Sequence, residues 1–103
     1  MNIVGISGTL GKPVELTKLD NIDILILNNT VKVLRNNKEK FDWINIIAYN
    51  ETAEYIASNF KIDDFVVIQG VLRTRSWISK ETEEKRLITE VLVFQIEGEG
   101  EGE

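Results

Sequence analysis

Alternating polar and apolar residues in the middle of the chain predict a strand that is buried on one face only. In residues 43–49 the even-numbered positions are all aliphatic, whereas the odd-numbered positions include Trp43, Asn45 and Tyr49. Successive side chains of a strand point to opposite sides, so the aliphatic positions share one face and belong in a core. The other face has no need of two aromatic residues unless they contact something.

A longer strand is predicted over residues 65–78, with an interruption at Gly70. Its second half places Arg73, Arg75 and Trp77 on one face. Guanidinium groups suit phosphates, and an exposed indole is a platform on which any base can stack. The ordinary alternative is a solvated strand with a half-buried tryptophan. If this strand and residues 43–49 share one sheet, their aromatic and cationic side chains form a surface that favours a nucleic acid.

Turn residues divide the rest of the chain into further strands and one helix. We predict strands at 2–10, bent at Gly5 and Gly8, and at 14–17, 22–35 and 86–96. Apolar residues three and four positions apart predict a single helix over 53–60, with Asn50 as its N-cap. Apart from the short segment 14–17, the order is three strands, a helix and two strands. This order predicts an all-β domain with one helix, a five-stranded OB-fold barrel with the helix between strands 3 and 4, rather than an SH3-like barrel or a sandwich.

The chain divides into one OB-fold domain at 1–96 and an acidic tail at 97–103, which alternates Glu and Gly and is expected to be disordered. The tail holds four of the 17 acidic side chains, whereas the other 96 residues carry 13 acidic and 12 basic side chains. The net charge of −5 therefore does not exclude a nucleic-acid partner. Affinity depends on the phosphates that a local patch neutralises, not on the total charge.

The sequence contains no cysteine and no histidine, which excludes thiol and histidine catalysis and the usual zinc ligands. A magnesium-dependent nuclease would need carboxylates, but the acidic clusters lie in predicted turns, where solvated charge is the usual explanation. We therefore expect no enzyme, no cofactor and no metal. No apolar run approaches the roughly 18 residues of a membrane span, and no signal-type N-terminus is present. We expect a cytoplasmic protein with no membrane partner.

Four segments, residues 43–49, 53–60, 66–77 and 89–93, together resemble the DNA-binding domain of bacterial and phage single-stranded DNA-binding proteins. The most specific part is the pattern Gly-x-Leu-Arg-Thr-Arg-x-Trp, which runs from Gly70 to Trp77. The segment from Gly8 to Pro13 resembles the first turn of that family. The similarity covers nearly all of residues 1–96.

This resemblance implies sequence-independent binding and protection of single-stranded DNA during replication, recombination or repair. It places two tryptophans and a tyrosine on the stacking positions of the family and two arginines on its basic groove positions. Asn45 stands where some members carry arginine. The candidate nucleic-acid-binding residues are Trp43, Tyr49, Arg73, Arg75, Trp77, Asn45, Lys32 and Arg35.

The family usually forms homotetramers around which the strand wraps, so the resemblance implies a homotetramer, with a dimer as the alternative. Outward-facing apolar residues such as Ile3, Phe65 and Val67 suit a subunit interface. A further family tryptophan is absent, because Val33 or Leu34 occupies its position. The acidic and apolar tip through which cellular members recruit replication and repair enzymes is also absent, which fits a short phage-type or specialised paralogue.

Another function within the same fold is a primosomal-type module that mainly binds replication proteins. Retention of both tryptophans and both arginines argues against it.

Overall fold

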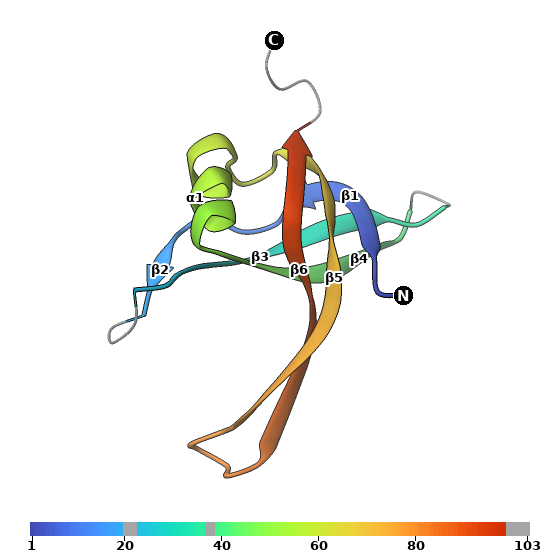
Figure 1. The fold of residues 1–103 in the computed structure, drawn as a ribbon. Coiled ribbons are helices and arrows are strands. Elements are labelled where there is room, and N and C mark those ends of the chain that lie inside the picture. Colours follow the sequence, from blue (N-terminus) through green and yellow to red (C-terminus); the bar gives the residue numbers. More distant parts are fainter. Residues whose placement is uncertain (20–22, 37–38, 99–103) are drawn as a thin grey trace.

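The computed structural model describes residues 1–19, 23–36 and 39–98. In these residues it contains six strands and one helix (Figure 1). In chain order the elements are β1 (Val4–Leu10), β2 (Thr17–Lys18), β3 (Leu25–Leu34), β4 (Phe41–Tyr49), α1 (Asn50–Asn59), β5 (Phe65–Ile78) and β6 (Lys85–Gly98). No helix in the described residues is long and apolar enough to cross a membrane.

The strands close into a barrel. Their order in the sheet is β1-β5-β6-β4-β3-β2, and an additional pairing of β1 with β3 completes a ring of hydrogen bonds. Neighbouring strands are antiparallel except β4 and β6, which run parallel where Ile47 lies opposite Leu92. If the two-residue β2 is set aside, five strands form the ring, and α1 follows the third of them. The predicted OB-fold is therefore confirmed.

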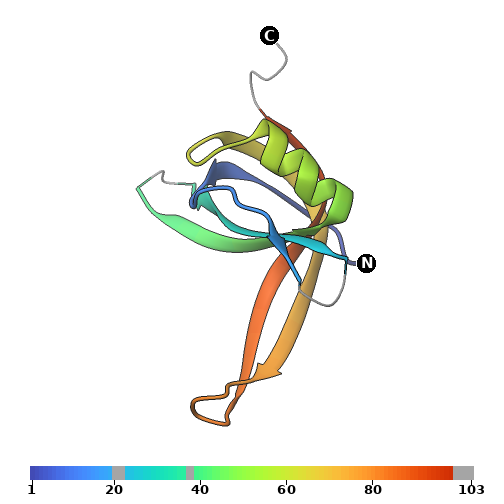
Figure 2. The same cartoon turned by 90° about the vertical axis from the view of Figure 1, so that its left-hand side faces the viewer.

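The predicted aliphatic faces form the core of this barrel. Leu27 and Val31 from β3, Ile46 from β4, Ile68 from β5 and Val91 from β6 are at most 1% exposed and belong to one cluster. Helix α1 packs against β3, β4 and β6 and adds two fully buried side chains to the cluster. It lies at the end of the barrel opposite to the part of the β5–β6 ribbon that projects from the barrel (Figures 1 and 2).

Gly8 allows β1 to approach β3 where the barrel closes. A Cβ at this position would lie 2.0 Å from the carbonyl oxygen of Lys32, a separation that no side chain can adopt. At Gly5 an added Cβ would meet nothing within 4 Å. Of the two predicted bends, only the one at Gly8 is required by close backbone packing.

The start of the helix differs from the prediction. Asn50 is the first residue of α1 and not its N-cap, a position that Tyr49 occupies without a side-chain hydrogen bond to the helix. Asn50 has a φ of 49°, a left-handed conformation that asparagine tolerates. Its Oδ1 accepts a hydrogen bond of 3.1 Å from the backbone N–H of Leu25. The side chain thus ties the β4–α1 junction to β3, which leaves it unable to cap the helix.

Strand β6 also extends further than predicted. Glu97 and Gly98 continue the ladder opposite Val67 and Val66 of β5, so the strand ends two residues beyond the predicted end at 96. Pairing of this kind uses backbone groups and needs no apolar side chain. Residues 99–103 of the acidic tail lie outside the described part of the chain.

Candidate nucleic-acid interface

The strand register brings most of the predicted site residues onto one face of the sheet. Residues directly opposite each other in antiparallel strands have side chains on the same face, and Trp43 lies opposite Lys32 of β3. Ile47, on the same side of β4, is paired with Leu92 of β6. We call this surface the aromatic–cationic face. It comprises Lys32, Trp43, Asn45, Tyr49, Arg73, Arg75 and Trp77, together with the buried Glu90.

One end of the face is an aromatic pair on β4. Trp43 is 52% exposed and packs edge-on against Phe41, with ring centroids 5.6 Å apart and an interplanar angle of 86°. The Nζ of Lys32 lies 4.3 Å from the centroid of the Phe41 ring. Lys32 thus places a positive charge beside an exposed indole, as binding of a phosphate next to a stacked base requires.

The backbone beneath Trp43 is held by a buried asparagine. Oδ1 of Asn29 accepts a hydrogen bond of 3.1 Å from the backbone N–H of Lys12, and its Nδ2 donates one of 3.0 Å to the Lys12 carbonyl. These bonds fix the turn next to Gly11. A Cβ at Gly11 would lie 2.3 Å from Cζ3 of Trp43, so the absence of a side chain there lets the indole lie directly over the turn.

Four residues from β4, β5 and β6 form a charged network at the centre of the face. The Nε atoms of Arg73 and Arg75 donate to Oε2 of Glu90 over 3.1 and 2.8 Å, and Nη2 of Arg75 donates to Oε1 over 3.3 Å. Nη2 of Arg73 donates to the hydroxyl oxygen of Tyr49. The Glu90 side chain is 1% exposed, whereas those of the two arginines are 32% and 40% exposed. The guanidinium groups therefore lie between a buried carboxylate and solvent.

Opposing influences act on the pKa of Arg73. Partial burial lowers it, but hydrogen bonds to Tyr49 and Glu90 raise it by more, so the pKa lies above the usual arginine value. The guanidinium group therefore remains charged beside the Tyr49 ring, whose centroid is 5.2 Å from its carbon.

The far end of the face lies on the part of the β5–β6 ribbon that projects from the barrel (Figure 1). Trp77 is 46% exposed there, and the guanidinium carbon of Arg75 lies 5.7 Å from its ring centroid. The residue opposite Trp77 on β6 is the exposed Arg86. The ribbon thus holds an indole and a second cation away from the barrel, where both are open to a ligand.

Arg35 is not on the aromatic–cationic face. It forms an ion pair with Asp42, with 2.7 Å between Nη2 and Oδ1. Asp42 lies opposite Val33, so its side chain alternates away from that of Trp43. Hydrogen bonding to each other raises the pKa of Arg35 and lowers that of Asp42. Both groups therefore stay charged and paired.

Asn45, in contrast, does lie on the aromatic–cationic face, half-buried between Trp43 and Ile47.

Three further residues of this region were not predicted from the sequence: Phe41, Arg86 and Glu90. The alternation of residues 43–49 extends back to Phe41 and would have included it had the strand been started two residues earlier. Finding Arg86 and Glu90 required the register between β5 and β6. That register contains an irregularity at Gln69 and Gly70, which shifts the pairing of the residues that follow.

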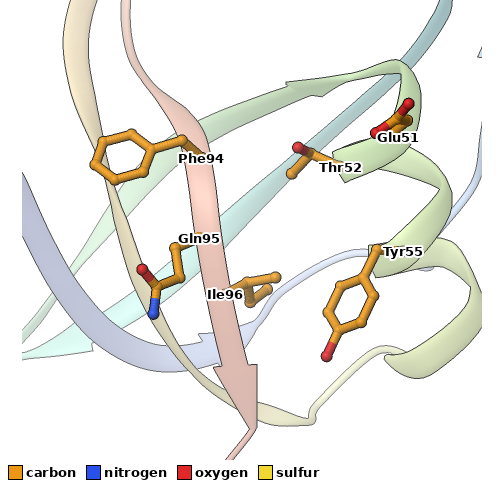
Figure 3. Close-up of a pocket in the computed structure, with 6 residues that line it drawn as sticks. All are labelled: Glu51, Thr52, Tyr55, Phe94, Gln95 and Ile96. Atoms are coloured by element: carbon orange, nitrogen blue, oxygen red, sulfur yellow. The ribbon is translucent and has the colours of Figure 1, made fainter.

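A hollow elsewhere on the molecule has different chemistry. Between α1 and β6 it encloses about 280 Å³ and is lined by Glu51, Thr52, Tyr55, Phe94, Gln95 and Ile96 (Figure 3). Its lining contains an acidic side chain and no basic one, which is unfavourable for a polyanion. Among the described residues, no three acidic side chains come together in a group that could hold a metal ion.

The sequence was compared with those of known protein families. The sequence model of the single-strand binding protein family matches residues 1–98, which include the whole barrel and the aromatic–cationic face. This chain belongs to the single-strand binding protein family. The resemblance seen in the sequence is therefore confirmed, and membership in this family agrees with the prediction that the chain is not an enzyme.

Two individual relatives match shorter regions. The chain is 29% identical over 62 residues to single-stranded DNA-binding protein 1 of Xylella fastidiosa (strain 9a5c), which covers 60% of this chain and 45% of that protein. It is 33% identical over 57 residues to single-stranded DNA-binding protein 1 of Chlorobaculum tepidum, which covers 55% of this chain and 35% of that protein. The matched region thus spans less than half the length of each relative.

Proposed function

We propose that this chain binds and protects single-stranded DNA, without sequence preference, during replication, recombination or repair. The observation that carries the proposal is the placement of two half-exposed indoles, Trp43 and Trp77, at the two ends of a face whose centre holds charged guanidinium groups. Bases stack on the aromatic rings, and phosphates approach the cations between them. The bases of a duplex are already stacked on one another, so it offers no comparable partner.

Binding of this kind makes and breaks no covalent bond. Each stacked base contributes about 1–3 kcal/mol as judged by alanine substitution, with little dependence on base identity. Each neutralised phosphate adds about 0.7 to the slope of log K against log salt for single strands. Because Glu90 pairs with both arginines, part of their positive charge is already offset before a phosphate approaches.

Fluorescence anisotropy with labelled oligonucleotides tests this proposal. We expect oligo-dT and a mixed-sequence single strand to bind with affinities within tenfold of each other and a duplex of equal length to bind far more weakly. The single strand should also become resistant to added nuclease, while remaining intact with the protein alone. Equal affinity for duplex and single strand, or cleavage of the strand by the protein, would refute the proposal.

We also propose that the chain assembles with copies of itself, as a homotetramer or a dimer, through the outer surface of β1 and β5. Val67 and Phe65 lie opposite Ser7 and Thr9 and are 44% and 39% exposed, and Ile3, which directly precedes β1, is 68% exposed. An apolar surface of this kind on a small domain is typical of an interface, and a second copy can offer the same surface in return.

Light scattering of the wild type and of Val67→Asp measures this assembly. The wild type is expected at a multiple of the chain mass, and the variant at a smaller multiple with its fold retained. A monomeric wild type would refute self-assembly and leave the DNA-binding proposal untouched.

A further inference from the structure

Glu90 occupies an unusual place for an acidic residue in a surface that attracts a polyanion. It is 1% exposed, yet it lies beneath the two arginines at the centre of the aromatic–cationic face. A buried carboxylate repels the phosphates that the arginines attract. Its place in a strand of the barrel does not explain why this side chain is acidic.

The hydrogen bonds divide the donors of each guanidinium group into an inner and an outer set. Glu90 accepts from Nε of Arg73, and from Nε and Nη2 of Arg75. Within the described residues, no hydrogen bond engages Nη1 of either arginine. An arginine has five N–H donors in a fixed planar arrangement, so fixing the Nε edge orients the remaining donors. Both groups are thus held in place before any ligand arrives.

The same bonds reduce the charge that the face presents. Two guanidinium groups and one carboxylate in direct contact carry a combined charge of +1. We propose that Glu90 is an internal counter-ion of the binding face, a positioning residue that orients Arg73 and Arg75 while limiting the pair to the charge of a single cation. This inference rests on the proposed binding of single-stranded DNA. It implies that the pair contributes about 0.7 to the salt slope for single strands rather than about 1.4.

Glu90→Gln tests this inference, since glutamine keeps the size of the side chain and one carbonyl acceptor but removes the negative charge. We expect the slope of log K against log salt for oligo-dT to steepen by about 0.7. Affinity should rise at low salt, and the gain should shrink as salt increases. An unchanged or shallower slope in a folded variant would overturn the inference.

The double variant Arg75→Gln/Glu90→Gln is the charge-matched control. It restores a combined charge of +1, so its salt slope should return to that of the wild type. A purely structural role for Glu90 predicts no such restoration, and a double variant that keeps the steeper slope would contradict the inference. If wild-type protein does not bind oligo-dT at all, the proposed function fails instead, which keeps the two failures distinguishable.

Nitrogen-15 NMR of the arginine side chains tests the same inference on the wild type, so this test does not depend on whether a variant folds. The Nε–H protons of Arg73 and Arg75 should be protected from exchange with water, both in the free protein and with oligo-dT bound, because Glu90 retains them. Arg86, which is exposed on the same ribbon, supplies the matched reference. Exchange of all three at the same rate would overturn the inference.

Discussion

Replacing Trp77 with alanine is expected to weaken the binding of oligo-dT by about 1–3 kcal/mol, or roughly fivefold to 150-fold. The indole is 46% exposed on the projecting part of the β5–β6 ribbon, so its loss removes a stacking platform and opens no cavity in the core. Trp43→Ala should have an effect of similar size, because that indole is 52% exposed at the other end of the face. Anisotropy titrations at one fixed salt concentration measure both effects.

Tyr55 supplies a matched aromatic control. It is 51% exposed but lies on α1 beside the acidic hollow, outside the aromatic–cationic face (Figure 3). Tyr55→Ala should leave the affinity for oligo-dT unchanged. An equal loss of affinity for Tyr55→Ala and Trp77→Ala would show that binding does not depend on the face. Unfolding of Trp77→Ala would identify that indole as a structural residue.

The largest expected effect on stability follows replacement of Ile56 with alanine, which should lower the free energy of unfolding by about 2–5 kcal/mol. Ile56 is fully buried on α1, within the cluster that also includes Ala53 and Phe60. Removing its outer carbons leaves a cavity that the surrounding strands can fill only in part. Chemical denaturation of the purified variant measures the loss.

Ile62→Ala is the control for this substitution. Ile62 follows the helix and is 42% exposed, so the same chemical change should alter the free energy of unfolding by no more than about 0.5 kcal/mol. Folded Ile56→Ala protein should retain its affinity for oligo-dT, because the helix contributes no residue to the aromatic–cationic face. An affinity loss as large as that of Trp77→Ala would contradict this separation of stability from binding.

Alternation along single strands was enough to predict which side chains of β4, and which of β5, point to the aromatic–cationic face. The period of two is imposed by the backbone, so the positions of Trp43 and Tyr49 relative to the aliphatic residues of β4 follow from the sequence alone. The same holds for Arg73, Arg75 and Trp77 on β5. The order of strands and helix likewise predicted the barrel, since few architectures place a helix at that point.

Contacts between strands could not be predicted from the sequence, because they depend on the register in which the strands pair. In the sequence, Glu90 is an ordinary polar residue of a strand; it becomes a buried partner of two arginines only when β5 and β6 pair beyond their irregularity at Gln69 and Gly70. Arg35 was also a candidate binding residue in the sequence, and only the structure shows its ion pair with Asp42. Tertiary structure determines the bonding partner of such side chains. The same holds for Asn50, which bonds to β3 and not to the helix.

Tryptophan fluorescence during titration with single-stranded DNA tests the central claim most directly. The only two tryptophans of the chain are those at the two ends of the face, so the emission reports on no other site. We predict strong quenching as oligo-dT of increasing length is added, because stacked bases quench an indole, and no comparable quenching by duplex DNA. Emission that stays unchanged at saturating oligo-dT would contradict the account, since neither indole would then contact a base.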